Sequence, residues 1–173
     1  MIFIGIDSGL SGAVAAVNSR GEPIACFDMP VMANGKGEAT VKQVVNGARL
    51  MEKLLILKAK DTQIVVYIER VSSMPDQGVA SMFSMGDSFG SIRTAVACAG
   101  IPFEFVSSVS WKKHFKLNGL SKVQREVKEF SRTKALELYP SLAELLKRKK
   151  DHNRSEALLI SCFARDINGK DRR

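Results

Sequence analysis

Short apolar runs separated by turn-forming residues dominate the first third of the chain. Three of them, at 2–7, 12–18 and 23–29, lie close together and predict three antiparallel strands in a meander. A fourth run, at 63–68, follows a predicted helix. A strand buried on both faces after a helical crossover should lie parallel to its neighbour. One more short strand is expected at 103–106.

Apolar positions spaced three and four residues apart predict six helices, while residues 31–39 are expected to form a loop. The first helix should run from an N-cap at Thr40 to about Lys58. The others are expected at about 79–99, 108–116, 121–138, 141–149 and 153–167. This order predicts an α/β fold in one domain, residues 1–173. Its core is a mixed five-stranded sheet, three antiparallel strands plus parallel strands, flanked by helices.

Composition points to a cytoplasmic protein. No apolar run reaches the roughly 20 residues that a membrane helix needs. The chain begins with a strand-like run and lacks the basic and apolar regions of a secretory signal. Its three cysteines are far apart, as expected of reduced thiols.

The positive charge is concentrated in one stretch. The chain has 26 basic and 18 acidic residues, and the segment from Lys112 to Arg154 alone holds 13 basic and 5 acidic ones. A one-sided basic field favours a polyanionic partner, most simply nucleic acid. The alternative is a solvated helical face.

Acidic residues lie at the ends of two predicted core strands. Asp7 ends the first and Glu69 the fourth, and Asp151 and Glu156 flank the start of the last helix. In open α/β sheets, ligands bind beyond the carboxyl ends of the strands. Three or four converging carboxylates suit Mg²⁺ or Mn²⁺, and two such ions can hydrolyse a phosphodiester. Taken singly, the acids have simpler interpretations as a turn former, an ion-pair partner and a helix cap.

Three ordered segments resemble the signatures of the RuvC-type Holliday-junction resolvases, within the RNase H-like superfamily. They are GIDSGLSGAVAAV, YIERV and DHNRSEALLIS. The stretch MFSMGDSFGSIRTAVACAGIPFEFVSSVSWKK also looks like the family's central helix, short strand and following helix. The resemblance implies an RNase H-like fold and a homodimeric endonuclease that uses two Mg²⁺ (or Mn²⁺) ions. It would nick four-way DNA junctions symmetrically, leaving 5′-phosphate and 3′-hydroxyl ends.

Carried over by position, the resemblance implies that Asp7, Glu69 and Glu156 are catalytic metal ligands. The family places a further acid or histidine three residues before the last one, where this chain has Asn153. We therefore expect Asp151 to be the fourth ligand, with His152 as second choice. The family can also carry an aromatic residue just after the strand-four glutamate. Here none occurs before Phe83.

Basic residues near these segments are predicted to contact DNA phosphates. They are Lys112, Lys113, Lys116, Lys122, Arg125, Lys147, Arg148, Lys149, Lys150 and Arg154. Trp111 could stack on a base or anchor its helix, and we favour the anchor. We expect the helix with Met82, Met85, Phe89 and two glycines to join the dimer interface. Core packing is the alternative for that helix.

Three other functions are compatible with parts of the sequence. One is a nuclease for flaps, other branched DNA or RNA–DNA hybrids, and another is a non-catalytic nucleic-acid-binding module. The segment GIDSG also resembles the first phosphate loop of the sugar-kinase and actin superfamily, but no second such loop or domain is present.

Overall fold

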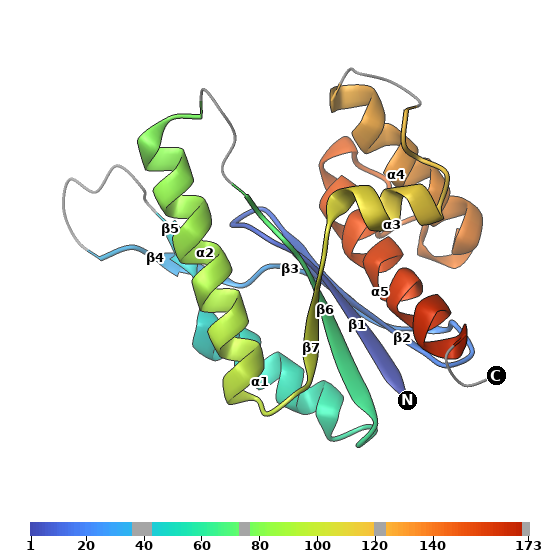
Figure 1. The fold of residues 1–173 in the computed structure, drawn as a ribbon, viewed down its shortest axis with the longest axis horizontal. Helices are drawn as coiled ribbons and strands as arrows, with labels where there is room; N and C mark the ends of the chain where they lie inside the picture. The colour runs from blue at the N-terminus through green and yellow to red at the C-terminus, as the bar shows by residue number, and fades with distance from the viewer. Residues whose placement is uncertain (36–42, 73–76, 120–123, 171–173) are drawn as a thin grey trace.

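A five-stranded mixed sheet forms the centre of the molecule (Figure 1). The computed structural model describes residues 1–35, 43–72, 77–119 and 124–170. The strand order is β3-β2-β1-β6-β7; β1 pairs antiparallel with β2 and parallel with β6, which pairs parallel with β7. The strands are β1 (Ile2–Asp7), β2 (Ala13–Asn18), β3 (Pro23–Asp28), β6 (Ile64–Glu69) and β7 (Phe103–Val106). The predicted meander and parallel strands are therefore confirmed.

Helices cover both faces of the sheet, α1 and α2 on one side and α3 to α5 on the other (Figure 1). Successive strand residues alternate between the two cores: Ile4 and Ile6 pack toward α1 and α2, and Phe3 packs toward α5. No helix in the described ranges is both long and apolar enough to span a bilayer. The helices are α1 (Gly47–Lys58), α2 (Val79–Cys98), α3 (Ser108–His114), α4 (Gln124–Leu138) and α5 (His152–Lys170).

The first strand and the last helix touch through their backbones at Gly5. A Cβ atom at this position would lie 2.2 Å from the carbonyl oxygen of Ala157 and 2.4 Å from the amide nitrogen of Ser161. Only a residue without a side chain permits this approach. The contact fixes α5 directly over β1.

The first helix begins later than the sequence predicts. Residues 43–45 form strand β5 (Gln43–Val45), which pairs with β4 (Val31–Ala33) in a separate hairpin. The expected cap at Thr40 lies outside the described residues, and Asn46 caps α1 by accepting a 2.9 Å hydrogen bond from the Arg49 amide. Residues 43–45 form a strand and not a helical turn because they pair with β4, and this pairing places Val45 in the core.

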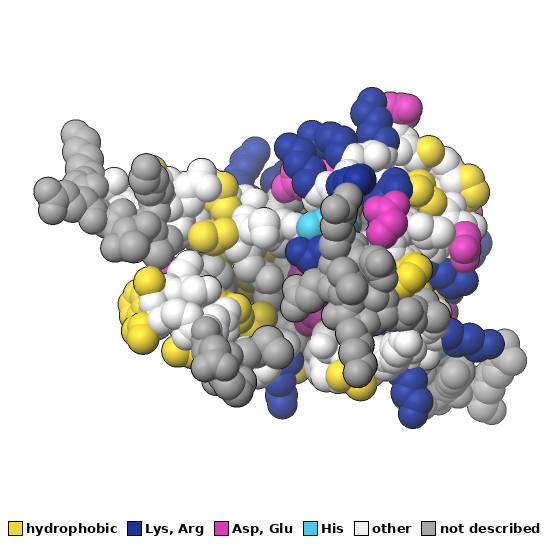
Figure 2. Space-filling model, turned by 90° about the horizontal axis from the view of Figure 1, so that it is seen from above, with side chains coloured by type: hydrophobic (Ala, Val, Ile, Leu, Met, Phe, Trp, Pro, Cys, Tyr) yellow, Lys and Arg dark blue, Asp and Glu magenta, His cyan; other side chains and the backbone are white. Residues whose placement is uncertain are grey.

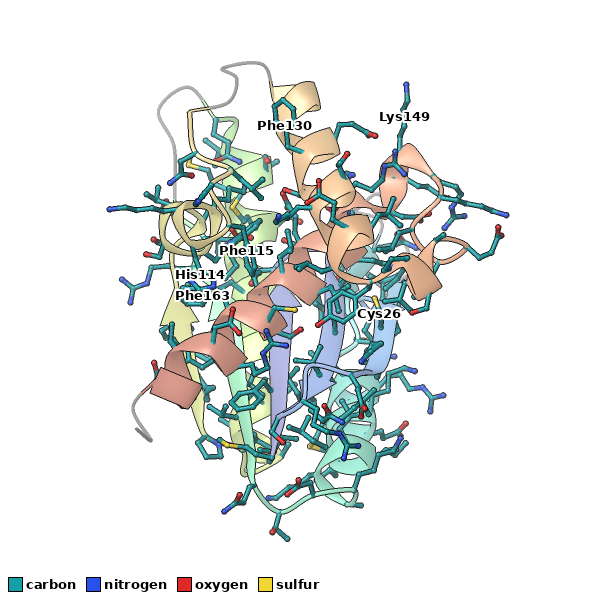
Figure 3. All side chains as sticks on the ribbon, turned by 90° about the vertical axis from the view of Figure 1, so that its right-hand side faces the viewer. Cys26, His114, Phe115, Phe130, Lys149 and Phe163 are labelled. Carbon is teal, nitrogen blue, oxygen red and sulfur yellow. The ribbon has the colours of Figure 1, made fainter. Side chains whose placement is uncertain are left out.

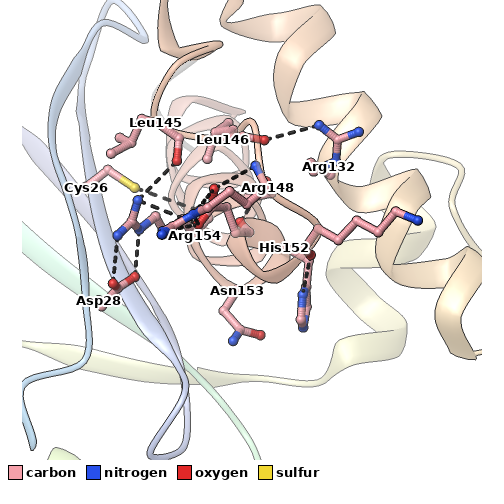
Figure 4. Close-up of polar contacts among 12 residues, drawn as sticks. Cys26, Asp28, Arg132, Leu145, Leu146, Arg148, His152, Asn153 and Arg154 are labelled. Carbon is pink, nitrogen blue, oxygen red and sulfur yellow. Dashed lines mark hydrogen bonds and ion pairs between the residues drawn. The ribbon is translucent and has the colours of Figure 1, made fainter.

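The predicted helix at 141–149 is wrong. The chain instead forms a short 3₁₀ helix at Pro140–Leu142, turns, and a second 3₁₀ helix at Lys149–Asp151. Two arginine side chains donate hydrogen bonds to backbone carbonyls between these two 3₁₀ helices. Arg154 donates to Leu145 and Arg132 to Leu146, each at 3.1 Å (Figure 4). These side chains satisfy two backbone carbonyls of this irregular segment.

Candidate metal centre

Three acids from separate elements converge at one edge of the sheet. Asp7 and Glu69 end the neighbouring parallel strands β1 and β6, and Glu156 lies in α5, next to the residue that packs on Gly5. One carboxylate oxygen from each lies within 4.8 Å of the others. The prediction that acids distant in sequence meet here is confirmed for these three residues.

The triad is buried without enough positive charge to balance it. Asp7 and Glu156 are less than a tenth exposed. Burial, followed by the charges of Glu156 and Glu69, raises the pKa of Asp7 well above its ordinary value of 3.8. Burial is also the main cause of the raised pKa of Glu69. Such a group of carboxylates is stabilised when a cation joins it.

The donor set fits a hard divalent cation. Mg²⁺ and Mn²⁺ prefer carboxylate oxygens, and an octahedral ion with ligands at about 2.1 Å holds neighbouring oxygens about 3–4 Å apart. The triad comes close to this spacing.

Two helices contribute polar partners that sequence reasoning missed. From α3, the Trp111 indole nitrogen donates to Glu69 Oε1 at 3.1 Å, and Lys112 Nζ lies 3.5 Å from Glu156 Oε1. From α4, the Ser131 hydroxyl donates to the same Glu156 oxygen at 3.1 Å. The expected anchoring role of Trp111 agrees with its complete burial, but no sequence signal revealed its bond to Glu69.

The contacts of one histidine, His114, join α3 to α5. His114 hydrogen-bonds to Asp166 at 2.8 Å, and its ring packs edge-on against Phe115 and Phe163 (Figure 3). His114 lies at the end of α3, three residues beyond Trp111. These contacts tie the end of α3, the helix that carries Trp111 and Lys112, to α5.

Asp151 and His152 do not join the triad, which corrects the expectation of a fourth ligand. The Asp151 carboxylate accepts hydrogen bonds from the Arg148 guanidinium at 2.7–3.1 Å and lies 3.8 Å from the guanidinium of Arg154. The side-chain hydrogen bond from Arg148 lowers the pKa of Asp151. His152 Nδ1 instead faces the Lys149 carbonyl at 3.0 Å (Figure 4).

Asn153, at the position where the family carries an acid or histidine, links α5 to the turn after β1. Its side-chain amide donates to the Ser11 carbonyl. The turn itself is tied to β6, because the Ser8 hydroxyl donates to the Glu69 carbonyl at 2.8 Å. Both contacts hold the strand ends that carry the acids.

Most basic side chains on the face seen in Figure 2 gather over the half of the molecule that contains α3 to α5. Lys113, Lys116, Lys149 and Lys150 are exposed, and Lys149 projects from the body in Figure 3. Arg154, another predicted DNA contact, instead donates two 2.6 Å hydrogen bonds to the Asp28 carboxylate. Of the other predicted contacts, Lys112 reaches the triad, Lys147 pairs with Glu144, Arg148 pairs with Asp151, and the side chains of Lys122 and Arg125 lie outside the described part.

A groove of about 620 Å³ opens beside the acids. One wall is the turn Ser8–Ser11, which directly follows Asp7, and another is the first half of α2. Val71, two residues after Glu69, also lines it. The groove therefore lies between α2 and the residues that follow Asp7 and Glu69 in the chain.

Comparison with known proteins identifies the fold. The sequence matches no protein-family model and no curated protein. Two solved structures of Thermus thermophilus RuvC match at 16% identity. The first has a TM-score of 0.52 and covers 97% of both chains; the second, solved in complex with Holliday junction substrate, has a TM-score of 0.56 and covers 93% of this chain and 90% of that one. The chain has a RuvC-like fold. The predicted RNase H-like architecture is thereby confirmed.

Proposed function

We propose that this protein is a divalent-metal-dependent DNA endonuclease that resolves four-way (Holliday) junctions by paired, symmetric nicks. The observation that carries the proposal is the buried triad of Asp7, Glu69 and Glu156 on a RuvC-like fold. A RuvC with this fold has been solved with Holliday junction substrate. That makes a four-way junction the first substrate to test.

The triad would hold two Mg²⁺ ions, with Mn²⁺ as a substitute. When bound, such a pair activates a water and stabilises the leaving oxygen, giving 5′-phosphate and 3′-hydroxyl ends. Asp7, Glu69 and Glu156 supply the negative charge that attracts the ions into a buried position. Lys112, beside Glu156, places a positive charge where a substrate phosphate would approach.

The basic face would bind the DNA arms. Lys113, Lys116, Lys149 and Lys150 are exposed and lie on the elements around the triad. Each phosphate that they neutralise adds to the salt dependence of binding. The groove next to the acids offers a path for the strand to be cut.

Paired nicks require two active sites, and we propose that α2 joins two copies of the chain. Val79 and Phe83, one helical turn apart, are 79% and 77% exposed. Phe89 is partly used by the chain itself, because its ring lies 5.3 Å from that of Phe105. The exposed first half of α2 is therefore the part proposed for the interface.

The decisive experiment compares wild type, Asp7→Asn and the control Glu104→Gln on matched four-way, flap, splayed and RNA–DNA hybrid substrates. Mg²⁺ and Mn²⁺ are each tested. We expect wild type and the control, an exposed acid on β7, to cut the junction at equal rates. Asp7→Asn should be at least 100-fold slower and bind the junction within twofold of wild type, because the basic face is unchanged.

Two results would overturn parts of the proposal. Wild-type cleavage by Asp7→Asn would remove the triad as the catalytic site. Faster cutting of flaps or hybrids than of junctions would assign the chain to the broader class of branched-DNA or hybrid nucleases.

A further inference from the structure

Two of the three acids are held at one oxygen by neutral donors from neighbouring helices. The Trp111 indole N–H, from α3, bonds to Glu69 Oε1, and the Ser131 hydroxyl, from α4, bonds to Glu156 Oε1, both at 3.1 Å. Both donor residues are fully buried. An indole N–H cannot bind a metal ion, and the Ser131 hydroxyl is turned toward Glu156, so both residues act on the carboxylates.

The chemistry of these donors suits orientation. An indole N–H can only donate, so Trp111 holds Glu69 strictly as an acceptor. A donor on one carboxylate oxygen restricts rotation of the carboxylate plane, and so restricts where the other oxygen points. Because both donors are neutral, neither of them adds a positive charge that would compete with a cation.

We propose that Trp111 and Ser131 are positioning residues that hold Glu69 and Glu156 in the orientation a divalent ion requires. The proposal rests on the metal-dependent function argued above. Partners of this kind typically change metal affinity by 10- to 100-fold when removed. Lys112 marks the contrast: its ammonium lies 3.5 Å from the same Glu156 oxygen and competes with a metal ion for the negative charge.

The test is calorimetric titration of Mn²⁺ into the full chain in the absence of DNA. Trp111→Phe and Ser131→Ala should each bind Mn²⁺ about 10- to 100-fold more weakly than wild type. Lys112→Met should bind it more tightly. The matched control is Ser161→Ala, which removes an equally buried hydroxyl that donates to the Leu158 carbonyl. Its Mn²⁺ affinity should stay within twofold of wild type.

Fluorescence gives a second measurement that leaves both Trp111 and Ser131 in place. Trp111 is the only tryptophan in the chain. Mg²⁺ does not quench tryptophan itself, so a change in emission on adding Mg²⁺ would report a change in the surroundings of the Trp111 indole, which bonds to Glu69. We expect this change in wild type and its loss in Glu156→Gln.

The outcomes separate the two proposals. The proposed function itself fails if wild type does not bind Mn²⁺, or if Glu156→Gln binds it as well as wild type does. If wild type binds Mn²⁺ but Trp111→Phe and Ser131→Ala stay within twofold, the positioning role is refuted and the metal site stands. If Trp111→Phe does not fold, Ser131→Ala and the Mg²⁺ fluorescence titration decide.

Discussion

Asp7 and Asp151 are both buried aspartates, yet their surroundings differ in charge. Asp7 faces two other acids, which together with burial raise its pKa. Asp151 is bonded by Arg148, which lowers its pKa. An acid that the chain's own cations already neutralise has little charge left for a metal ion. This difference separates a candidate ligand from a structural residue.

The two residues should have opposite effects on stability. The pKa of Asp7 is raised on folding, so stability falls as pH rises from about 3.8 toward the folded-state pKa. At pH 7 with EDTA, Asp7→Asn should therefore raise the Tm, by about 2–4 °C for each kcal/mol relieved. The gain should vanish below about pH 3.8, where the carboxyl is protonated in both states. Thermal melts across pH test this; a lower Tm at pH 7 would contradict it.

Asp151→Asn is the matched comparison. Its lowered pKa means that the carboxylate stabilises the fold above about pH 3.8, and that this stability is lost as pH falls through the folded-state pKa. At pH 7 the variant should lose about 2 kcal/mol, since hydrogen bonds to a charged group are broken. Its cleavage rate at a temperature where it stays folded should remain near that of wild type.

At the scale of elements, one backbone contact joins two parts of the site. Gly5 in β1 touches α5 at Ala157, and the residues that carry the acids, Asp7 and Glu156, lie within two positions of this contact. The separation between strand and helix therefore sets the separation between the acids. Hydrogen bonds from α3 to Glu69 and from α4 to Glu156 complete the arrangement.

Gly5→Ala should damage both fold and site. The added methyl would overlap backbone atoms, which cannot move as a side chain can, so α5 must shift or the sheet must distort. We expect a loss of at least about 2 kcal/mol in the free energy of unfolding and weaker Mn²⁺ binding. Gly169→Ala, in α5 where a Cβ would meet nothing, should keep or raise stability. Equal denaturation midpoints for the two variants would contradict the argument.

The proposed dimer also belongs to one element, α2. Phe83→Asp should shift the mass in solution from dimer to monomer, because it places a charge on the exposed apolar turn. Ile56→Asp, on the exposed face of α1, is the control and should leave the mass unchanged. Light scattering at micromolar concentration, with and without junction DNA, measures this. A wild-type protein that is monomeric under both conditions would refute the interface.

At the scale of the whole molecule, the face seen in Figure 2 divides into two halves that differ in charge. Basic side chains gather over α3 to α5, while the half that carries α2 shows mainly neutral and apolar groups (Figure 2). The acids lie where the strands of the central sheet end, between these halves. A DNA strand bound by the basic half would pass the acids and reach the groove beside α2.

The basic half should govern DNA affinity by position and not only by net charge. Lys149→Glu should weaken junction binding, most visibly at higher salt, and should reduce the salt slope by about 1 if it contacts one phosphate. Lys60→Glu changes the net charge equally but lies in the turn after α1. Anisotropy titrations over a range of salt concentrations compare them. Equal losses for the two variants would favour a general charge effect.

Patterns along the chain were enough to predict the five strands of the central sheet, most helices and two of the acids by their places, but not the hairpin of β4 and β5. Apolar runs define the buried strands, and an acid at the end of such a run marks a strand end that faces a ligand; Asp7 and Glu69 follow this logic. The local apolar pattern predicted the wrong secondary structure at 43–45 and 141–149, where contacts with residues distant in the sequence determine the conformation. Val45 fills the core, and Arg132 and Arg154 donate to two backbone carbonyls of the irregular segment.

Only the tertiary structure decided which acids share a site. Spacing near the start of α5 could not separate Asp151 from Glu156, because the choice depends on where Arg148 and Arg154 place their charges and on how closely Gly5 lets α5 approach β1. The bonds from Trp111 and Ser131 were equally invisible in sequence. Hydrophobic periodicity is a local property of the chain, whereas charge balance and hydrogen bonding in a buried site depend on residues that only folding brings together.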